Sequence, residues 1–222
     1  MTLQAVVSLV VRDLSRAAAR MWQAEPARER YRAWLEISHD LLRATAPLLA
    51  EAVAECVRRG EGRLAAYYAE QLQEEYGHED WVAQDYAAAG GDPAHLGQRV
   101  PAPVAARLAG AQYYWLRHAH PVALAGHIAV LEWHPPRPNL VPTLVRRTGL
   151  PRTAFSTLER HIDLDAGHGR RLEQALSGMD LPVQWRRLLT TSALTSAYGL
   201  VDLMADIAQG TTENPQPAGG EP

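Results

Sequence analysis

The chain has 222 residues, of which 47% are hydrophobic and 21% are charged, and its formal net charge is -3. This length and apolar content are sufficient for a single domain with a full core. The small net charge argues against the strong electrostatic field of a protein that binds nucleic acid or an anionic membrane. All 22 basic residues are arginine, which excludes a lysine Schiff base within this chain.

The single cysteine and the N-terminal segment favour a soluble protein in a reducing, cytoplasmic location. Cys56 is alone and cannot form an internal disulfide. The apolar run near the N-terminus has no basic region before it and is interrupted by Arg12 and Asp13, so we expect an amphipathic helix rather than a signal peptide. No run reaches the roughly 20 apolar residues of a membrane span.

The hydrophobic periodicity is helical almost everywhere, with no convincing alternating run, and predicts an all-α, single-domain bundle over residues 1–210. The polar tail, 211–222, is rich in proline and glycine and is expected to be disordered. In chain order, the expected helices cover residues 4–23, 26–59, 63–89, 103–119, 121–133, 140–149, 151–178 and 182–209, and the fourth and fifth are either separate or continuous across Pro121.

The segment "HIDLDAGH" places potential metal ligands at spacings of four and three on one expected helix. At about 100° per residue, His161, Asp165 and His168 fall within a sector of roughly 60° and can converge on one point. Imidazoles combined with a carboxylate suit iron, manganese or zinc. The alternative is a solvated polar stripe with a hydrogen-bonded pair.

Two further expected helices carry ligands of the same kind. In "LQEEYGHEDW", Glu75 lies three residues and Glu74 four residues before His78, and Glu-x-x-His is the spacing used by di-metal sites in helical bundles. Glu132 follows a dozen mostly apolar residues, where burial of a carboxylate is costly unless it is paired or bound to a metal. Its alternative role is that of a residue at a helix end. Together the three helices predict a metal site.

The order of these motifs, "EEYGHE", "HPVALAGHIAVLE" and "HIDLDAGH", resembles the haem-oxygenase-like diiron oxidases and oxygenases, the iron-containing redox enzyme family, over residues 30–205. The resemblance implies a compact seven-helix bundle that binds two Fe(II) ions and activates O2 as co-substrate. The reactions that it implies are N-oxygenation of amines, C–C cleavage of amino acids and oxidative decarboxylation of fatty acids. The metal ligands that it implies are Glu75, His78, Glu132, His161, Asp165 and His168.

Part of the ligand shell stays open at this point. Glu74 is an alternative to Glu75, and some relatives place a glutamate ligand where this chain has Gln71. A carboxylate from the preceding helix is a further alternative, and the candidates are Glu36, Asp40 and Glu51.

The same resemblance implies a small-molecule substrate, namely an amine, an amino acid or a carboxylic acid. The high content of arginine and alanine is compatible with a GC-rich bacterial gene and a biosynthetic role, so we expect a place in bacterial secondary metabolism. Trp81, Tyr114 and Trp115 are candidates for the lining of its pocket, although aromatic residues at helical spacing also build cores. We expect a homodimer, because closed symmetric dimers are the commonest oligomers.

Two other classes of protein are compatible with the same scaffold. One is a metal-free enzyme, either a thiaminase-II-like hydrolase with a cysteine nucleophile or a cofactorless oxidase. Cys56 has no evident partner base nearby in the sequence, and neither type requires the "HIDLDAGH" set. The other is a non-enzymatic helical bundle for iron storage, regulation or structure.

Overall fold

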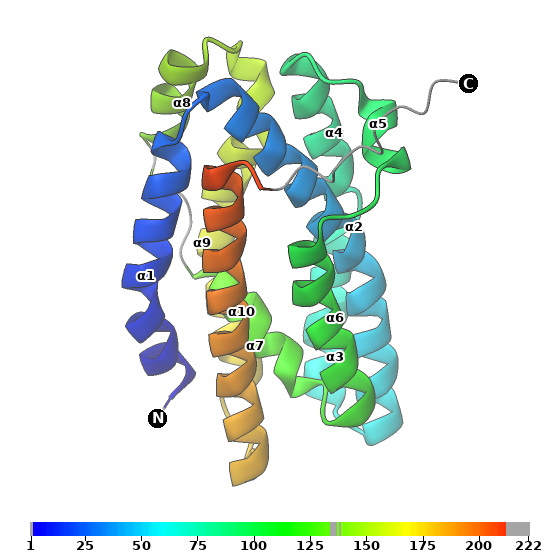
Figure 1. The fold of residues 1–222 in the computed structure, drawn as a ribbon. Helices are drawn as coiled ribbons and strands as arrows, with labels where there is room; N and C mark the ends of the chain where they lie inside the picture. Colours follow the sequence, from blue (N-terminus) through cyan, green and yellow to red (C-terminus); the bar gives the residue numbers. More distant parts are fainter. Residues whose placement is uncertain (1, 134–136, 138, 212–222) are drawn as a thin grey trace, which may run out of the picture.

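The computed structural model describes residues 2–133, 137 and 139–211, and for residues 163–168 it describes the backbone alone. The described chain forms a helical bundle without strands, which confirms the predicted all-α class (Figure 1). The elements are α1 (Leu3–Gln23), α2 (Ala27–Arg59), α3 (Gly62–Glu75), α4 (His78–Ala88), α5 (Pro93–Gln98), α6 (Pro103–His118), α7 (Val122–Glu132), α8 (Leu140–Thr148), the 3-10 helix η1 (Arg152–Phe155), α9 (Ser156–Leu176) and α10 (Val183–Gln209).

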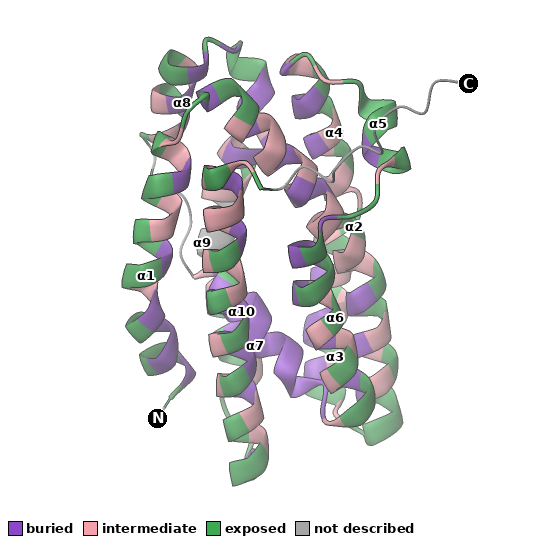
Figure 2. Cartoon of the chain, viewed as in Figure 1, coloured by how far each residue is buried: buried purple, intermediate pink, exposed green. Residues whose placement is uncertain are grey.

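Helix α7 is the central element of the bundle. All its residues from Val122 to Val130 are buried, and Figure 2 shows this helix in the buried colour between the outer helices. It packs against α10, and α10 also packs against α1. Gly126 permits this close approach, because a Cβ atom there would lie 2.2 Å from the carbonyl oxygen of Leu189 on α10.

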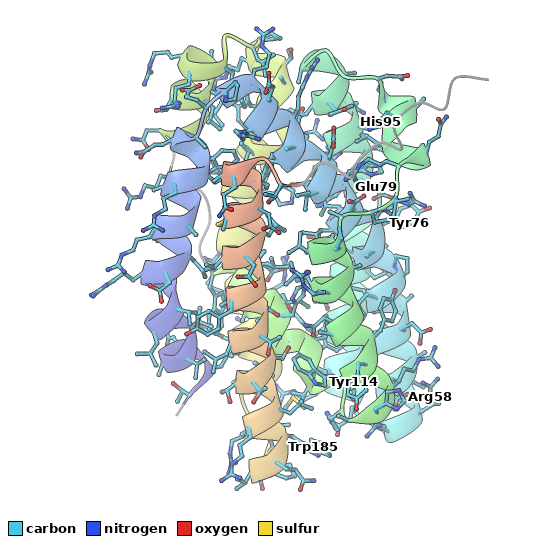
Figure 3. The ribbon with its side chains drawn as sticks, in the orientation of Figure 1. Arg58, Tyr76, Glu79, His95, Tyr114 and Trp185 are labelled. Atoms are coloured by element: carbon cyan, nitrogen blue, oxygen red, sulfur yellow. The ribbon has the colours of Figure 1, made fainter. Side chains whose placement is uncertain are left out.

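The segment expected as one helix at 63–89 is two helices, and this prediction was wrong. Tyr76 has an extended backbone and Gly77 has a φ of 86°, in the left-handed region that glycine adopts at low cost. Tyr76 is 78% exposed and lies at the outer side of the bundle (Figure 3). Glu75 therefore ends α3 and His78 begins α4. This break and the unexpected α5 give more helical segments than the seven-helix bundle that we expected.

The predicted break at "GEG" is confirmed, because α2 ends at Arg59, Gly60 follows with a φ of 75°, and α3 starts at Gly62. The chain then returns, and α3 packs along α2. The predicted tail, 211–222, lies outside the described residues except for Thr211.

Among the described residues, α10 is long and apolar enough to cross a membrane by length and composition alone. We expected no such segment, because we counted uninterrupted apolar residues and α10 contains a few charges. The core helix of a soluble protein passes the same test. Here α10 packs against α1, α6 and α7, and it buries the hydroxyl side chains of Ser192 and Ser196.

Candidate metal centre

The turn between α3 and α4 and the first part of α9 bring three potential metal ligands together. One ligand atom each from Glu75, His78 and His161 lies within 4.8 Å of the other two. The side chains of His78 and Glu75 are only 4% and 12% exposed, and His161 is half-buried. The helices meet here because α9 packs against both α3 and α4. The structure thus joins two of the predicted motifs into one cluster.

Glu75 and His78 face each other across the turn. The distance between Nδ1 of His78 and Oε2 of Glu75 is 3.0 Å. This is an ion-pair distance, but the geometry is not that of a hydrogen bond, and Nδ1 is a buried nitrogen without a hydrogen-bond partner among the described residues. A buried polar atom without a partner is costly. A cation bound by both side chains would remove that cost.

His161 is held in one tautomer by its own helix. Its Nδ1 lies 2.8 Å from the carbonyl oxygen of Thr157. A carbonyl oxygen can only accept, so Nδ1 carries the proton and donates it. In the neutral imidazole the lone pair is then on the other nitrogen, Nε2, as a metal ligand requires.

Aromatic stacking covers one side of the cluster. The indole of Trp81 stacks on the imidazole of His78 with ring centroids 3.8 Å apart, and its centroid lies 6.2 Å from that of His161. The two imidazoles meet edge to face at 5.3 Å. The guanidinium carbon of Arg160 lies over the Trp81 ring at 4.4 Å. Trp81 therefore shields the cluster from water on this side.

Glu132 lies at the end of α7 and is only 9% exposed. Its charge is one cause of the raised pKa of Tyr67 on α3, after the larger effect of burial. The next residue, Trp133, donates its indole N–H to the backbone carbonyl of Gly169 on α9. Glu132 therefore lies where α7 meets α9 and has a neighbour on α3. It is not part of the three-residue cluster found among the described residues.

Asp165 and His168 lie outside the described side chains. Their helix, α9, is continuous from Ser156 to Leu176, so the helical backbone that their predicted convergence requires is present. Their roles as ligands remain predictions.

The other carboxylates that the sequence left as possible metal ligands have partners elsewhere in the structure. Glu74 pairs with Arg171, which favours Glu75 as the metal ligand. On α2, Glu36 accepts a hydrogen bond from Tyr86, Asp40 pairs with Arg99, and Glu51 pairs with Arg117. Gln71 is 1% exposed and lies one turn before Glu75 on α3.

Two of the predicted pocket residues, Tyr114 and Trp115, lie on α6. Tyr114 is 62% exposed at the outer side of this helix, and its ring is tilted against that of His118 (Figure 3). Helix α6 packs against α2, α7 and α10. Of the three predicted pocket residues, Trp81 has ring contacts with both imidazoles of the cluster.

One residue near the cluster was not identified from the sequence. Asp85 of α4 is completely buried, and its carboxylate accepts hydrogen bonds from the first residues of α9. Its position in the apolar stretch "WVAQDYAAAG" was the only available signal. Its partners are about 70 residues away in the chain, so their identity could not be read from the sequence.

The all-helical bundle and its cluster of imidazole and carboxylate side chains are the features expected of a metal-binding helical enzyme. The chain belongs to the iron-containing redox enzyme family, whose model matches residues 33–191. This match confirms the resemblance read from the motifs. A search of curated proteins found no match.

Solved structures confirm the haem-oxygenase-like fold. A domain of unknown function with a heme oxygenase-like fold from Shewanella denitrificans is 15% identical, with a TM-score of 0.78, over 94% of this chain and 90% of its own. A TenA homolog from Pseudomonas syringae pv. tomato is 14% identical, with a TM-score of 0.64, over 91% and 92%. A CADD-like protein of unknown function from Nostoc punctiforme is 11% identical, with a TM-score of 0.68, over 95% and 96%.

Proposed function

We propose that this protein is a non-haem diiron oxidase or oxygenase that activates O2 and acts on a small amine, amino acid or carboxylic acid. The observation that carries the proposal is the convergence of Glu75, His78 and His161 from three helices. The family is one of iron-containing redox enzymes, and this cluster has the composition that its metal requires.

The donor set fits iron. Two imidazole nitrogens and a carboxylate oxygen are ligands that first-row transition metals accept. The Nδ1 of His78 is buried beside the carboxylate without a hydrogen-bond partner among the described residues. In our proposal these three residues hold one iron, and Glu132, Asp165 and His168 complete the centre and hold a second.

Bound iron would supply the one-electron and O2 chemistry that protein side chains lack. The chain itself supplies orientation and shielding. The Thr157 carbonyl fixes the ring of His161, and Trp81 covers His78. The guanidinium of Arg160 lies over the Trp81 ring, and in our proposal its N–H groups bind the carboxylate of a substrate.

The structure argues against a cysteine-dependent hydrolase, the alternative suggested by the scaffold. Cys56 is completely buried. Burial, together with the charges of Glu61 and Glu55, raises the pKa of its thiol to about 12. A thiol must be deprotonated to act as a nucleophile, so Cys56 is a residue of the core.

The test is an anaerobic Fe(II) titration of the metal-free protein, followed by rapid mixing with O2 under optical detection. We expect binding of about two irons per chain and an oxygen-dependent absorbance change. Glu75→Gln should weaken iron binding by roughly 10-fold or more. Glu74→Gln is the matched control, because it removes the ion pair with Arg171 and leaves Glu75 in place. Absence of iron binding by the wild type would contradict the proposal.

A further inference from the structure

The N-terminus of α9 is bound by a single buried carboxylate from α4. Oδ1 of Asp85 accepts hydrogen bonds from the amide and the hydroxyl of Ser156, at 3.2 and 2.6 Å. Oδ2 accepts one from the amide of Thr157, at 2.8 Å. Asp85 is completely buried, so these three bonds replace its contacts with water. A negative charge at this end of α9 is also favoured by the helix dipole.

The same two helices carry the two histidines of the cluster. On α4, His78 lies seven residues, or about two turns, before Asp85, and therefore on the same side of the helix. On α9, Thr157 lies one turn before His161 and accepts its Nδ1 proton at 2.8 Å. The amide of Thr157 is thus bound to Asp85, and its carbonyl is bound to His161.

The contacts form a closed path from one imidazole to the other. It runs from His78 along α4 to Asp85, through Thr157 to His161, and back across the 5.3 Å between the two ring centroids. The 3-10 helix before α9 is also anchored, because the buried hydroxyl of Tyr31 donates to the carbonyl of Ala154 at 2.6 Å. The start of α9 is therefore fixed by bonds to neighbouring helices.

We infer that Asp85 is a positioning residue of the metal centre, which sets the distance and orientation of His161 relative to His78 through the peptide of Thr157. This inference rests on the proposed function, since it requires a metal at these histidines. Asp85 touches neither metal nor substrate in this account. It acts through the first turn of α9, and its loss should change the geometry of the bound metal.

Asp40 provides a matched control. Its side chain is also buried, with only 4% exposed, and its carboxylate accepts a hydrogen bond from the amide of Ala102 at the start of α6, at 2.9 Å. Its ion pair is with Arg99. Loss of Asp40 therefore removes a comparable helix anchor that is not connected to His161.

The experiment is a Co(II) titration of the metal-free protein, followed through the visible absorption of bound Co(II). We expect Asp85→Ala to weaken Co(II) binding by roughly 10-fold or more, as loss of an outer-shell partner does, and to shift the absorption bands. Asp85→Asn keeps an acceptor for Ser156 but loses the negative charge, so its Co(II) affinity and absorption bands should lie between those of Asp85→Ala and the wild type. This variant replaces Asp85→Ala in the test if Asp85→Ala does not fold. Asp40→Ala should lower the melting temperature without changing affinity or spectrum.

The outcomes separate this inference from the proposed function. If the wild type binds no Co(II), the metal centre itself is wrong and the inference fails with it. If the wild type binds Co(II) and folded Asp85 variants keep its affinity and spectrum, Asp85 only stabilises the fold, and the inference alone is overturned. A change of equal size in the Co(II) affinity and spectrum of Asp40→Ala would also overturn the inference about Asp85.

Discussion

Trp133, at the end of α7, donates its indole N–H to the backbone carbonyl of Gly169 on α9, with 3.3 Å between Nε1 and the oxygen. The contact requires glycine, because a Cβ atom at position 169 would lie 2.6 Å from Cδ1 of the indole. It joins the helix that carries Glu132 to the helix that carries His161.

Gly169→Ala should therefore separate α7 from α9 and lower the free energy of unfolding by roughly 1–3 kcal/mol, the usual range for overpacking. Urea denaturation measures this change. Gly110→Ala on α6 is the control, because a Cβ there meets nothing within 4 Å, and it should leave stability unchanged or raise it by about 0.5–1 kcal/mol. Equal stability of Gly169→Ala and the wild type would show that the close contact is absent.

Replacement of Glu132 by glutamine should reduce the amount of iron bound. Our proposal makes this carboxylate a ligand of the centre, and a neutral amide is a weaker ligand for iron than a carboxylate. Equilibrium dialysis followed by iron analysis should find fewer irons per chain than in the wild type. Glu51→Gln, which removes only an ion pair with Arg117, is the control. An unchanged iron content in Glu132→Gln would leave Glu132 as a residue of the helix end.

Acidification should destabilise the protein through His127. This imidazole accepts a hydrogen bond from the Ser196 hydroxyl or donates one to it, at 2.8 Å, and burial lowers its pKa to about 4. Between pH 6.5 and 4 the unfolded chain binds a proton that the folded chain does not. Stability is therefore lost as the pH falls through this window, by about 3 kcal/mol in total, and the loss levels off below it.

The pH effect is measured by urea denaturation between pH 7.5 and 4. His127→Gln should flatten the dependence of stability on pH relative to the wild type. His95→Gln changes an exposed histidine of α5 (Figure 3) and serves as the control. If the wild type and His127→Gln show the same slope, protonation of His127 does not limit stability.

Cys56 should be inert in the native protein. Its buried thiol has a raised pKa, so a disulfide reagent at pH 8 should react with it slowly before denaturation and rapidly afterwards. Cys56→Ala should bind iron and consume O2 as the wild type does. A folded Cys56→Ala protein that binds iron but has lost its activity would revive a catalytic role for the thiol.

Helical periodicity was sufficient to predict the fold class and most helices. It did not reveal the break after Glu75, because the polar residues on either side of Gly77 continue a helical pattern and a single glycine is tolerated in many helices. The sequence nevertheless indicated that Glu75 and His78 lie close together, and their role as metal ligands stays a prediction. The turn brings the two side chains within 3.0 Å, although no continuous helix joins them.

Helix α5 was missed although it carries local signals. Asp92 caps it by accepting a hydrogen bond from the amide of Ala94, and Pro93 occupies its first turn. At six residues it is too short to show a hydrophobic period.

The anchoring of His161 could not be predicted, because it depends on a long-range contact. Thr157 and Asp85 are 72 positions apart, and only the packing of α4 on α9 brings them together. The choice of Glu75 over Glu74 as the metal ligand also depends on packing, because Arg171 of α9 forms an ion pair with Glu74.

Anomalous diffraction at the iron absorption edge, on crystals grown anaerobically with Fe(II), tests the central claim most directly. The account predicts an anomalous peak bounded by the side chains of Glu75, His78 and His161, and the loss of this peak in crystals of His161→Ala. An iron-loaded protein without density at this position, or with iron only at surface sites, would contradict it.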